Sequence, residues 1–391
     1  MHKKWSWGFR DNKPRKKVAG REGDSSGTMT KRPEVLIVGA GVIGCSIAWH
    51  LASRGLSDVR VIDRGLELGA GSTSRATGGY RAQFGTGINV RLSLLSREKL
   101  KRFHEEVGAD PGYRPHGYLF VASSEPQLQR LRDAQKVQHG AGLTEARLVT
   151  ADEVGQLNPH IARNGVVGGA FCPTDGFIDP MAILRGYMEA AKRLGARFDF
   201  GVPYDRRADA DLVVNAAGAW ANEVANVPVT PLRRQVLPTI GAGPLTADLP
   251  MTIFVEDGFH FRVRDGRVLL LWPGGPEPRT PDDITVDPRW IRSVEALARE
   301  RVPGLADVKT DAKAAYAGLY DMSPDAHAIL GRVDNMVFAN GSSGHGVMHA
   351  PAIGQLVAEL ILDGRARSLD IHPLRPSRFR EDDPIHGVEV F

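Results

Sequence analysis

The chain has 391 residues, of which 42% are hydrophobic and 25% are charged, as in an ordinary soluble globular protein large enough for two domains. Its net charge of +4 comes from residues 1–28, whose eight Lys or Arg and three Asp or Glu leave about −1 on the remainder. A basic nucleic-acid-binding face is therefore not expected, and the absence of a run of about 18 apolar residues predicts no transmembrane segment.

Residues 1–28 form a segment of their own at the start of the chain. They are polar, contain Gly and Ser, and lack apolar periodicity, so we expect a disordered basic tail. The apolar core of a secretory signal is missing, although the basic character superficially suits a transit peptide. A simpler interpretation is that synthesis begins at Met29, just ahead of the first strand.

The first predicted structural unit covers 34–63. Residues 35–44 read Val-Leu-Ile-Val-Gly-Ala-Gly-Val-Ile-Gly, which predicts an apolar strand, a G-x-G-x-x-G turn and a helix that opens at Val42. A second apolar run follows the helix and closes at Asp63. A strand, a glycine turn, a helix, a second strand and an acidic residue together predict a dinucleotide site.

Each residue of this unit has an expected role. Gly39 allows the tight turn, Gly41 lets the backbone approach a pyrophosphate, and Gly44 lets the helix pack closely on the strand. The helix directs its first N–H groups and its positive dipole end at the phosphates. Asp63 can accept hydrogen bonds from ribose hydroxyls. These residues alone do not distinguish FAD from NAD.

Further elements alternate along the chain. A loop rich in Gly and hydroxyl residues covers 69–79, and the segment 223–310 reads as strands and loops, with an Asp-Gly hairpin over 262–268. The other predicted helices and strands are a helix over 88–103, a strand over 117–122, a helix over 125–141, a helix from Pro180 to Gly195, a strand from 211, a strand over 335–340, and a helix after the glycine-rich loop 341–346.

Strand–helix alternation at both ends of the chain, with strand-rich material between, predicts two interleaved domains. The expected fold class is α/β, with a discontinuous Rossmann-type dinucleotide-binding domain and an α+β substrate domain that holds a mostly antiparallel sheet. We place the dinucleotide-binding domain at 29–110, 175–222 and 325–375. The substrate domain then takes 111–174 and 223–324, and 376–391 is a C-terminal tail.

The two cysteines, Cys45 and Cys172, stand apart from one another in the sequence. Neither has metal-ligand spacing, so no metal site is expected, and Cys45 fits as a small packing residue within the first helix. So few cysteines suit a reducing compartment, and we expect a cytoplasmic protein.

Several motifs resemble a known family. The segments 39–44, 71–74, 213–220, 318–325 and 341–346 occur in the order seen in D-amino-acid-oxidase-type flavoproteins. Within that group the chain is most similar to the sarcosine oxidase and dimethylglycine dehydrogenase branch, over about 34–375. The resemblance implies FAD rather than NAD as the cofactor.

The resemblance also implies how FAD is held. The loop 341–346 and the helix after it would lie beside the pyrimidine edge of the isoalloxazine, where helix N–H groups stabilise negative charge. The cysteine that some relatives link to flavin falls at Gly318, so non-covalent FAD is expected. Members of the family carry a small β-meander at the position of 196–217, and this segment is too short for three strands, so part of the adenine-side wall would be missing and FAD affinity reduced. The expected FAD-binding residues are Gly39, Gly41, Val42, Ile43, Gly44, Asp63, Arg64, Gly71, Ser72, Thr73, Ala217, Gly218, Gly344, His345, Gly346, Val347 and Met348.

For the substrate, Arg81 aligns with an arginine that contacts the amino-acid carboxylate in these oxidases, and a guanidinium fork suits a carboxylate. The family's second carboxylate contact, a lysine, is replaced by Met348, so another residue such as Arg262 would have to supply it. His345 either contacts the substrate amine or merely caps the following helix. His260, Arg262 and Tyr320 complete the candidate pocket residues.

The resemblance therefore predicts FAD-dependent oxidation of the C–N bond of a secondary or N-methylated amino acid, by hydride transfer to flavin. The electron acceptor is O2 or a protein, and the absence of a lysine counterpart near 258–264 favours a dehydrogenase. A partner subunit is possible. Two alternatives stay open: oxidation of a 2-hydroxy acid on the same scaffold, and a flavoprotein without turnover that serves as an assembly or binding factor.

Overall fold

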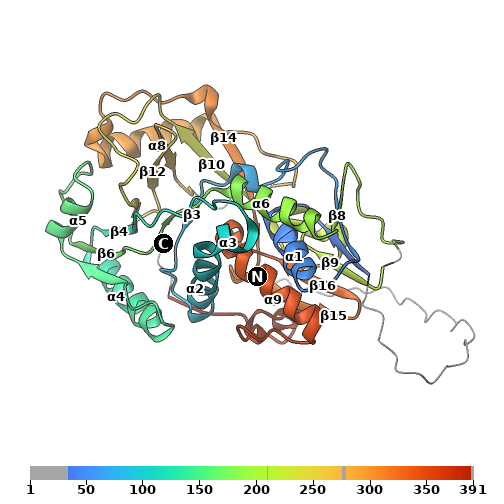
Figure 1. Ribbon diagram of the computed structural model, residues 1–391. Coiled ribbons are helices and arrows are strands. Elements are labelled where there is room, and N and C mark those ends of the chain that lie inside the picture. Colours follow the sequence, from blue (N-terminus) through green and yellow to red (C-terminus); the bar gives the residue numbers. More distant parts are fainter. Residues whose placement is uncertain (1–33, 209, 275–278, 389–391) are drawn as a thin grey trace, which may run out of the picture.

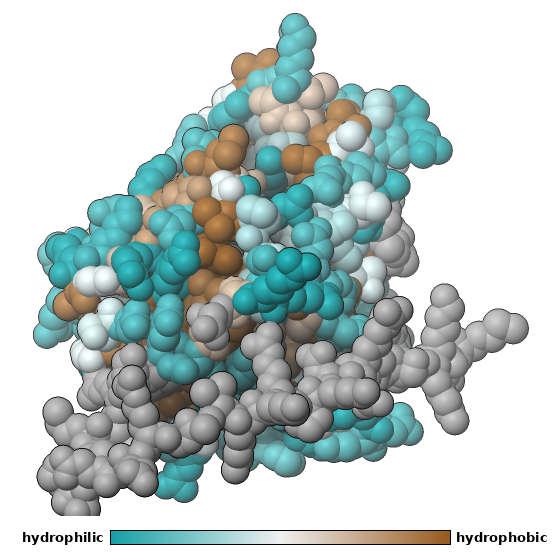
Figure 2. All heavy atoms as spheres, turned by 90° about the vertical axis from the view of Figure 1, so that its right-hand side faces the viewer, coloured by the Kyte–Doolittle hydropathy of each residue, from teal (hydrophilic) through white to brown (hydrophobic). Residues whose placement is uncertain are grey.

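The computed structural model describes residues 34–208, 210–274 and 279–388, and contains two large sheets (Figure 1). The expected tail over 1–28 lies outside the described residues. No helix within the described ranges has both the length and the apolar character needed to cross a lipid bilayer. On the face shown in Figure 2, hydrophilic side chains surround the apolar patches.

The six-stranded sheet is dominated by parallel pairs, with only its β15–β16 pair antiparallel. All four side chains of β1 are buried, as expected for a central strand covered on both faces. The strands, in spatial order, are β15 (Ile329–Val333), β16 (Met336–Asn340), β9 (Leu212–Asn215), β1 (Val35–Val38), β2 (Val59–Asp63) and β8 (Arg197–Phe200).

Helices cover this sheet and enclose the largest apolar core. Helix α1 (Val42–Ser53) packs against both α6 (Pro180–Arg193) and α9 (Gly346–Asp363), and α9 also contacts α2 (Gly87–Lys101). Helix α6 begins where the sequence predicts, because the carboxylate of Asp179 accepts hydrogen bonds from the N–H groups of Met181 and Ala182 at 2.9 and 3.0 Å. A short helix, α3 (Phe103–Val107), follows α2.

The eight-stranded sheet is antiparallel except for the β4–β11 pair. Its predicted hairpin is confirmed: Asp265 and Gly266 both have positive φ, of 52° and 70°, as a two-residue turn requires. The strands, in spatial order, are β14 (Tyr316–Met322), β10 (Thr230–Pro238), β13 (Arg267–Leu271), β12 (His260–Arg264), β11 (Met251–Phe254), β4 (Tyr118–Ala122), β6 (Gly168–Cys172) and β5 (Arg147–Val149).

The expectation of strands and loops alone across 223–310 is wrong, because α8 (Pro288–Arg301) lies there. Asp287 caps this helix by accepting a hydrogen bond from the N–H of Arg289 at 2.8 Å. Trp290, Val294 and Ala298 are the buried residues of α8 and join the core beneath the sheet. In Figure 1, α8 lies on the opposite side of the strands from α4 (Glu125–Gly140), while α5 (Ala151–Leu157) lies at the sheet's outer end.

The remaining elements are short. A two-stranded sheet of β3 (Gly79–Tyr80) and β7 (Gly176–Phe177) is separate from the two larger sheets. The others are α7 (Ala221–Val224) and the 3-10 turns η1 (Thr73–Arg75), η2 (Gly218–Trp220), η3 (Pro303–Leu305), η4 (Ala312–Ala314), η5 (His372–Leu374) and η6 (Pro376–Phe379).

The fold class is as predicted: a parallel-dominated sheet with a mostly antiparallel second sheet. The strands of each sheet fall within the sequence ranges assigned to the corresponding domain, whose exact boundaries stay predictions. Within the described part of 196–217, β8 alone precedes β9 and extends the six-stranded sheet beside β2. The segment after Pro376 packs on the body of the protein, since the side chain of Arg378 is fully buried.

Candidate functional site

A cavity of about 1160 Å³ runs between the two sheets. Its wall includes the carboxyl ends of β1, β2, β9 and β16, which is where ligands bind in open α/β sheets. The other wall includes residues of β10, β11, β12, β13 and β14 of the eight-stranded sheet. Among the predicted FAD-binding residues, all but Gly44 line this cavity.

The three glycines of the first turn meet different surroundings. A Cβ on Gly39, whose φ is 109°, would lie 2.4 Å from the Ala216 carbonyl oxygen, and one on Gly44 would lie 1.9 Å from the Gly39 oxygen. A Cβ on Gly41 would meet only the Oγ1 of Thr73, at 3.7 Å. Gly39 and Gly44 are therefore required by packing, whereas the space beside Gly41 is open to a ligand.

Helix α1 presents its N-terminus to the cavity without a side-chain cap from its N-cap residue, Gly41. The N–H of Val42 donates to Thr73 Oγ1 at 3.2 Å. The two carboxylate oxygens of Asp63 accept from the N–H groups of Ala40 and Gly65, both at 2.7 Å. Each oxygen keeps a further lone pair, so the residue can still accept a ribose hydroxyl.

The cavity rim near this turn carries an ion pair over an indole. Arg64 donates to Glu223 at 3.0 Å, and its guanidinium carbon lies 5.4 Å from the ring centroid of Trp220. The Nε1 of Trp220 is buried and has no hydrogen-bond acceptor within the described residues. Ser72 donates its hydroxyl to the Leu319 carbonyl at 2.8 Å, which ties the 71–73 loop to β14.

A second helix N-terminus, that of α9, faces the same cavity. Its N-cap residue, His345, makes no side-chain capping bond, so the capping role considered for this imidazole is not seen. The next residues, Gly346, Val347 and Met348, line the cavity and have N–H groups at the start of the helix. Two helix ends that face one cavity, neither capped by the side chain of its own N-cap residue, suit a ligand that carries negative charge at two separate places.

The loop before α9 is held by a buried carboxylate. Asp321 accepts a hydrogen bond from the Ser342 N–H at 3.1 Å and another from its hydroxyl. Burial raises the pKa of Asp321. Gly344, at φ 87°, lies against Tyr320 so closely that a Cβ would come within 2.4 Å of the ring.

Gly318 brings no nucleophile to the cavity wall. A Cβ at this position would lie 3.1 Å from the Cβ of Arg75, so Arg75 already packs against the place of the side chain that glycine lacks. Arg75 itself lines the cavity.

Arg81 lies on the cavity wall and is only 9% exposed. It donates to the Gln83 carbonyl at 2.6 Å, and its guanidinium carbon lies 4.0 Å from the ring centroid of Phe84. Burial lowers the pKa of Arg81. The ring of Phe84 also contacts His345, whose ring is nearly perpendicular to it at a centroid distance of 4.7 Å.

The polar rings of the wall have shifted pKa values. Burial lowers the pKa of His260 to about 4 and holds that of His345 well below its ordinary value, with Arg81 acting in the same direction on both. Both imidazoles are therefore neutral at pH 7. Burial also raises the pKa of Tyr320, which stays protonated. His260 is fixed by a 2.7 Å contact of its Nδ1 with the Gly258 carbonyl.

Arg262 lies outside the cavity lining. Its guanidinium donates to the carbonyls of Thr77 and Gly78 at 2.7 and 3.1 Å and lies 3.6 Å from the Phe177 ring centroid. Burial lowers its pKa to about 10. Arg262 therefore stabilises the glycine-rich loop on the side away from the cavity. We had expected it to supply the second cation for a substrate carboxylate, in place of the lysine that Met348 replaces, and this arrangement does not fit that role.

Several cavity residues were not predicted from the sequence. The lining also includes Tyr118, Trp220, Arg234, Trp272 and Asp321. Trp220 and Asp321 lie inside motifs that the sequence had singled out, and Trp272 directly follows β13. Tyr118 and Trp220 are aromatic residues near the ends of predicted strands, which was the available signal for these two.

Cys45 and Cys172 are buried free thiols. Burial raises the pKa of both, that of Cys172 to about 12, so neither forms a thiolate at neutral pH. Within the described ranges there is no group of three or more His, Cys, Asp or Glu side chains placed to hold a metal ion.

The chain is similar to known flavoproteins. Residues 34–360 match the family model described as FAD dependent oxidoreductase, DAO. FAD-dependent oxidoreductase domain-containing protein 1 of Xenopus laevis is 29% identical, with 91% of this chain and 84% of that protein aligned. Human mitochondrial dimethylglycine dehydrogenase is also 29% identical, over 93% of this chain but 47% of its own length, so the chain spans about half of that relative.

Solved structures share the fold. L-proline dehydrogenase from P. horikoshii superimposes with a TM-score of 0.81 at 26% identity, over 91% of this chain and 100% of that one. Glycine oxidase from Geobacillus kaustophilus gives a TM-score of 0.76 at 24% identity, over 89% and 99% of the two chains.

Proposed function

Because this chain belongs to the DAO family of FAD-dependent oxidoreductases, we propose that it oxidises the C–N bond of a secondary or N-methylated amino acid. The observation that carries this proposal is the buried guanidinium of Arg81 on a cavity wall that also holds the N-terminus of α9. Named relatives that act on dimethylglycine and L-proline support an amine of this kind.

FAD fits the residues present. The open space beside Gly41 and the start of α1, which has no side-chain cap from its N-cap residue, suit the pyrophosphate. The buried Nε1 of Trp220 offers a hydrogen-bond donor at the rim, and the start of α9 suits the pyrimidine edge of the isoalloxazine. With glycine at 318, we propose that FAD is held without a covalent bond. Acid precipitation should then leave the flavin in the supernatant, and yellow colour retained in the pellet would contradict this.

Carboxylate capture is the proposed role of Arg81. A desolvated guanidinium binds a carboxylate more strongly than a solvated one does, since little water competes. Met348 adds no second cation, so the amino-acid carboxylate would rest on Arg81 and the helix end. This arrangement positions the substrate carbon that bears the amine.

When bound, FAD would supply a two-electron oxidant: a hydride lost from the C–H bond beside the neutral amine leaves an iminium ion, which water hydrolyses to a carbonyl compound and a free amine. The chain's own contribution is position and proton control. His260 and His345 stay neutral, so each can accept a hydrogen bond from an amine N–H without adding a positive charge beside it. The ring of Tyr320 on the cavity wall limits water at this end.

The decisive experiment is anaerobic reduction of the purified holoprotein. Sarcosine, dimethylglycine and proline should bleach the visible flavin absorbance, and admission of air would then distinguish O2 from a protein acceptor by the rate of recovery. Bleaching only by 2-hydroxy acids would replace the amine proposal with hydroxy-acid oxidation. A flavin that no member of a broad panel bleaches would favour a binding or assembly role.

A further inference from the structure

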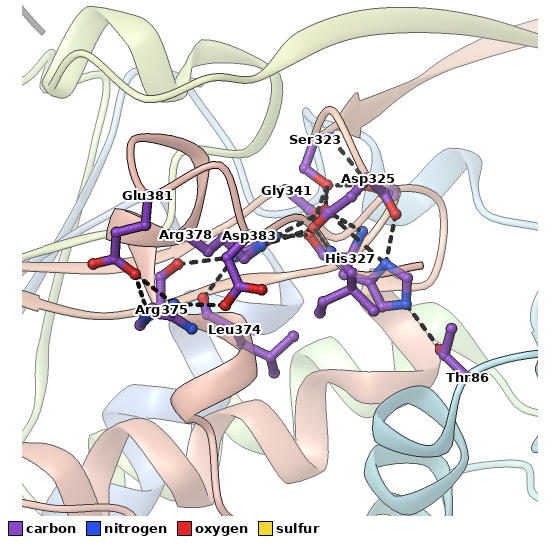
Figure 3. Close-up of polar contacts among 12 residues, drawn as sticks. Thr86, Ser323, Asp325, His327, Gly341, Leu374, Arg375, Arg378, Glu381 and Asp383 are labelled. Atoms are coloured by element: carbon purple, nitrogen blue, oxygen red, sulfur yellow. Dashed lines mark hydrogen bonds and ion pairs between the residues drawn. The ribbon is translucent and has the colours of Figure 1, made fainter. Parts of the chain in front are cut away.

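A buried ion pair fixes the end of the described chain. Arg378, on η6, is fully buried and forms a two-pronged pair with Asp325, at 2.8 Å from Nε and 2.9 Å from Nη2 (Figure 3). The same guanidinium donates to the carbonyls of Leu374 and His327, at 2.8 and 3.1 Å. Such a desolvated pair holds its partners in one geometry, because moving them apart would leave two buried charges without their counter-ions.

The pair also holds residues 385–388, which we term the C-terminal strap. The N–H of Ile385 donates to the Asp325 carboxylate at 3.1 Å, and the N–H of Val388 donates to the Gly85 carbonyl at 3.0 Å. The backbone of the strap and the backbone at Gly85 meet without side chains between them. A Cβ on Gly387 would lie 2.1 Å from the Cγ2 of Thr86, and one on Gly85 would lie 1.8 Å from the Val388 oxygen.

Thr86 is held from a second side. Its hydroxyl contacts the Nε2 of His327 at 2.8 Å, as Figure 3 shows. Thr86 is the N-cap residue of α2, yet its side chain makes no capping bond to that helix. A hydroxyl that would ordinarily cap its own helix thus anchors the loop to the Asp325–His327 turn instead.

This loop leads directly to the proposed carboxylate site. Phe84 precedes Gly85 and contacts two groups of the cavity wall. Its ring centroid lies 4.0 Å from the guanidinium carbon of Arg81 and 4.7 Å from the ring centroid of His345. The front of the loop is fixed separately, since the Asp175 carboxylate accepts from the Ala82 N–H at 2.7 Å. The rear of the loop depends on the strap and on His327.

The same turn reaches the loop that precedes α9. The hydroxyl of Ser323 donates to the His327 carbonyl at 2.6 Å, and the N–H of Ser323 donates to the Ser343 hydroxyl at 3.1 Å. The network around Asp325 therefore borders both parts of the cavity wall on which a carboxylate would lie.

We propose that the C-terminal strap, fixed by the Arg378–Asp325 pair, positions Phe84 and the Arg81 guanidinium for carboxylate binding. Arg378, His327 and Gly387 are then positioning residues that contact neither substrate nor cofactor. This proposal rests on the proposed function for its substrate, but the ordering of the 84–86 loop can be measured without any substrate.

The test uses the holoprotein with Gly387→Ala, whose added methyl must displace the strap from Thr86. Gly140→Ala is the matched control, because a Cβ there meets nothing within 4 Å. Pyrrole-2-carboxylate, a planar carboxylate without an oxidisable amine C–H, is titrated against the flavin absorbance. Gly387→Ala should raise its Kd about tenfold, the loss of roughly one hydrogen bond to a charged group, with the control unchanged.

Two further measurements make the outcome unambiguous. In an Arg81→Gln background, Gly387→Ala should cause no additional loss, because the strap acts through Arg81. With an oxidised amino acid the variant should raise KM far more than it lowers kcat. An unchanged Kd in Gly387→Ala, or an undiminished effect in the Arg81→Gln background, would overturn the proposal.

Failure of the proposed function would look different. If the wild-type holoprotein binds no carboxylate and is reduced by no amino acid, the substrate assignment fails. Amide hydrogen exchange over 84–88 then decides the strap's role: faster exchange in Gly387→Ala than in Gly140→Ala supports positioning, and equal exchange in the two variants refutes it.

Discussion

Gly39, Gly41 and Gly44 belong to one motif but meet different surroundings, and this difference is the clearest evidence at the residue scale. Two of them have backbone atoms where a Cβ would be, and the middle one faces the cavity. Their substitutions should therefore separate folding from cofactor binding.

We expect Gly41→Ala to leave the thermal stability of the FAD-free protein unchanged while weakening FAD binding about tenfold or more, since a charged hydrogen bond to phosphate is worth roughly 1.5–3 kcal/mol. Gly44→Ala should instead destabilise the FAD-free protein by about 2 kcal/mol, because the methyl overlaps the Gly39 oxygen. Flavin fluorescence titration and thermal melts measure the two effects. Equal behaviour of the two variants would argue against a ligand beside Gly41.

Arg81 provides the second prediction at this scale. Arg81→Lys keeps the charge but loses the planar fork that stacks on Phe84, so the KM for an amino-acid substrate should rise roughly ten- to a hundredfold. FAD content, read from the ratio of visible to ultraviolet absorbance, should stay at the wild-type value. Arg262→Lys serves as the comparison, since Arg262 lies outside the cavity lining and should alter stability more than KM.

At the scale of elements, the start of α9 depends on one carboxylate. Asp321 accepts both hydrogen bonds of Ser342 and so fixes the loop from which the helix begins. The geometry of the helix end toward a bound flavin follows from this loop rather than from α9 alone.

Asp321→Asn should lower FAD affinity by about tenfold, because one strong acceptor of the loop is replaced by a neutral amide. Ser342→Ala removes only the hydroxyl bond and should have a smaller effect. Isothermal titration of FAD into the flavin-free variants measures both. An Asp321→Asn variant with wild-type affinity would show that the loop needs no such support.

The elements themselves were predicted unevenly. Helices α6 and α8 both start with an Asp-Pro pair, at 179–180 and 287–288, yet only the first was predicted. The Asp-Pro pair indicates a helix start in both cases, but the second pair lies within 223–310, which we interpreted as strands and loops throughout. Turn chemistry was more reliable, since Asp265-Gly266 can form its hairpin whatever surrounds it.

The whole molecule carries buried histidines that set its response to acid. Burial lowers the pKa of His50 and His349 to about 3, from an ordinary value near 6.5, and both side chains are at most 5% exposed. As the pH falls below about 6.5, the unfolded chain binds protons that the folded chain does not. The folded state therefore loses stability from about pH 6.5 downward.

Each of these two histidines should contribute about 1.4 kcal/mol per pH unit to this loss. Asp175, whose pKa burial raises to about 6, acts in the opposite direction between about pH 4 and pH 6 and offsets part of the loss. Urea unfolding at pH 7, 6 and 5 measures the slope. His50→Gln should reduce the slope by about 1.4 kcal/mol per pH unit, which corresponds to one proton. An unchanged slope would show that His50 is not the group responsible.

At this scale the sequence predicted the fold class, and all of the predicted FAD-binding residues except Gly44 line the cavity, because apolar strand patterns and glycine turns are local signals. Long-range contacts escaped it. Nothing local to Arg262 indicates that its guanidinium bonds the carbonyls of 77 and 78, and nothing near Thr86 indicates a contact with His327. Such pairs form only when segments far apart in the chain are packed together.

The order of strands in the six-stranded sheet has a consequence for synthesis. Strand β1 pairs with β2 from the same early segment, but its other neighbour is β9, and β16 joins still later. A growing polypeptide presents the glycine turn long before the wall formed by Gly344 and Met348 exists. On the ribosome, FAD should therefore associate after translation of this region and stabilise an assembled fold rather than nucleate it.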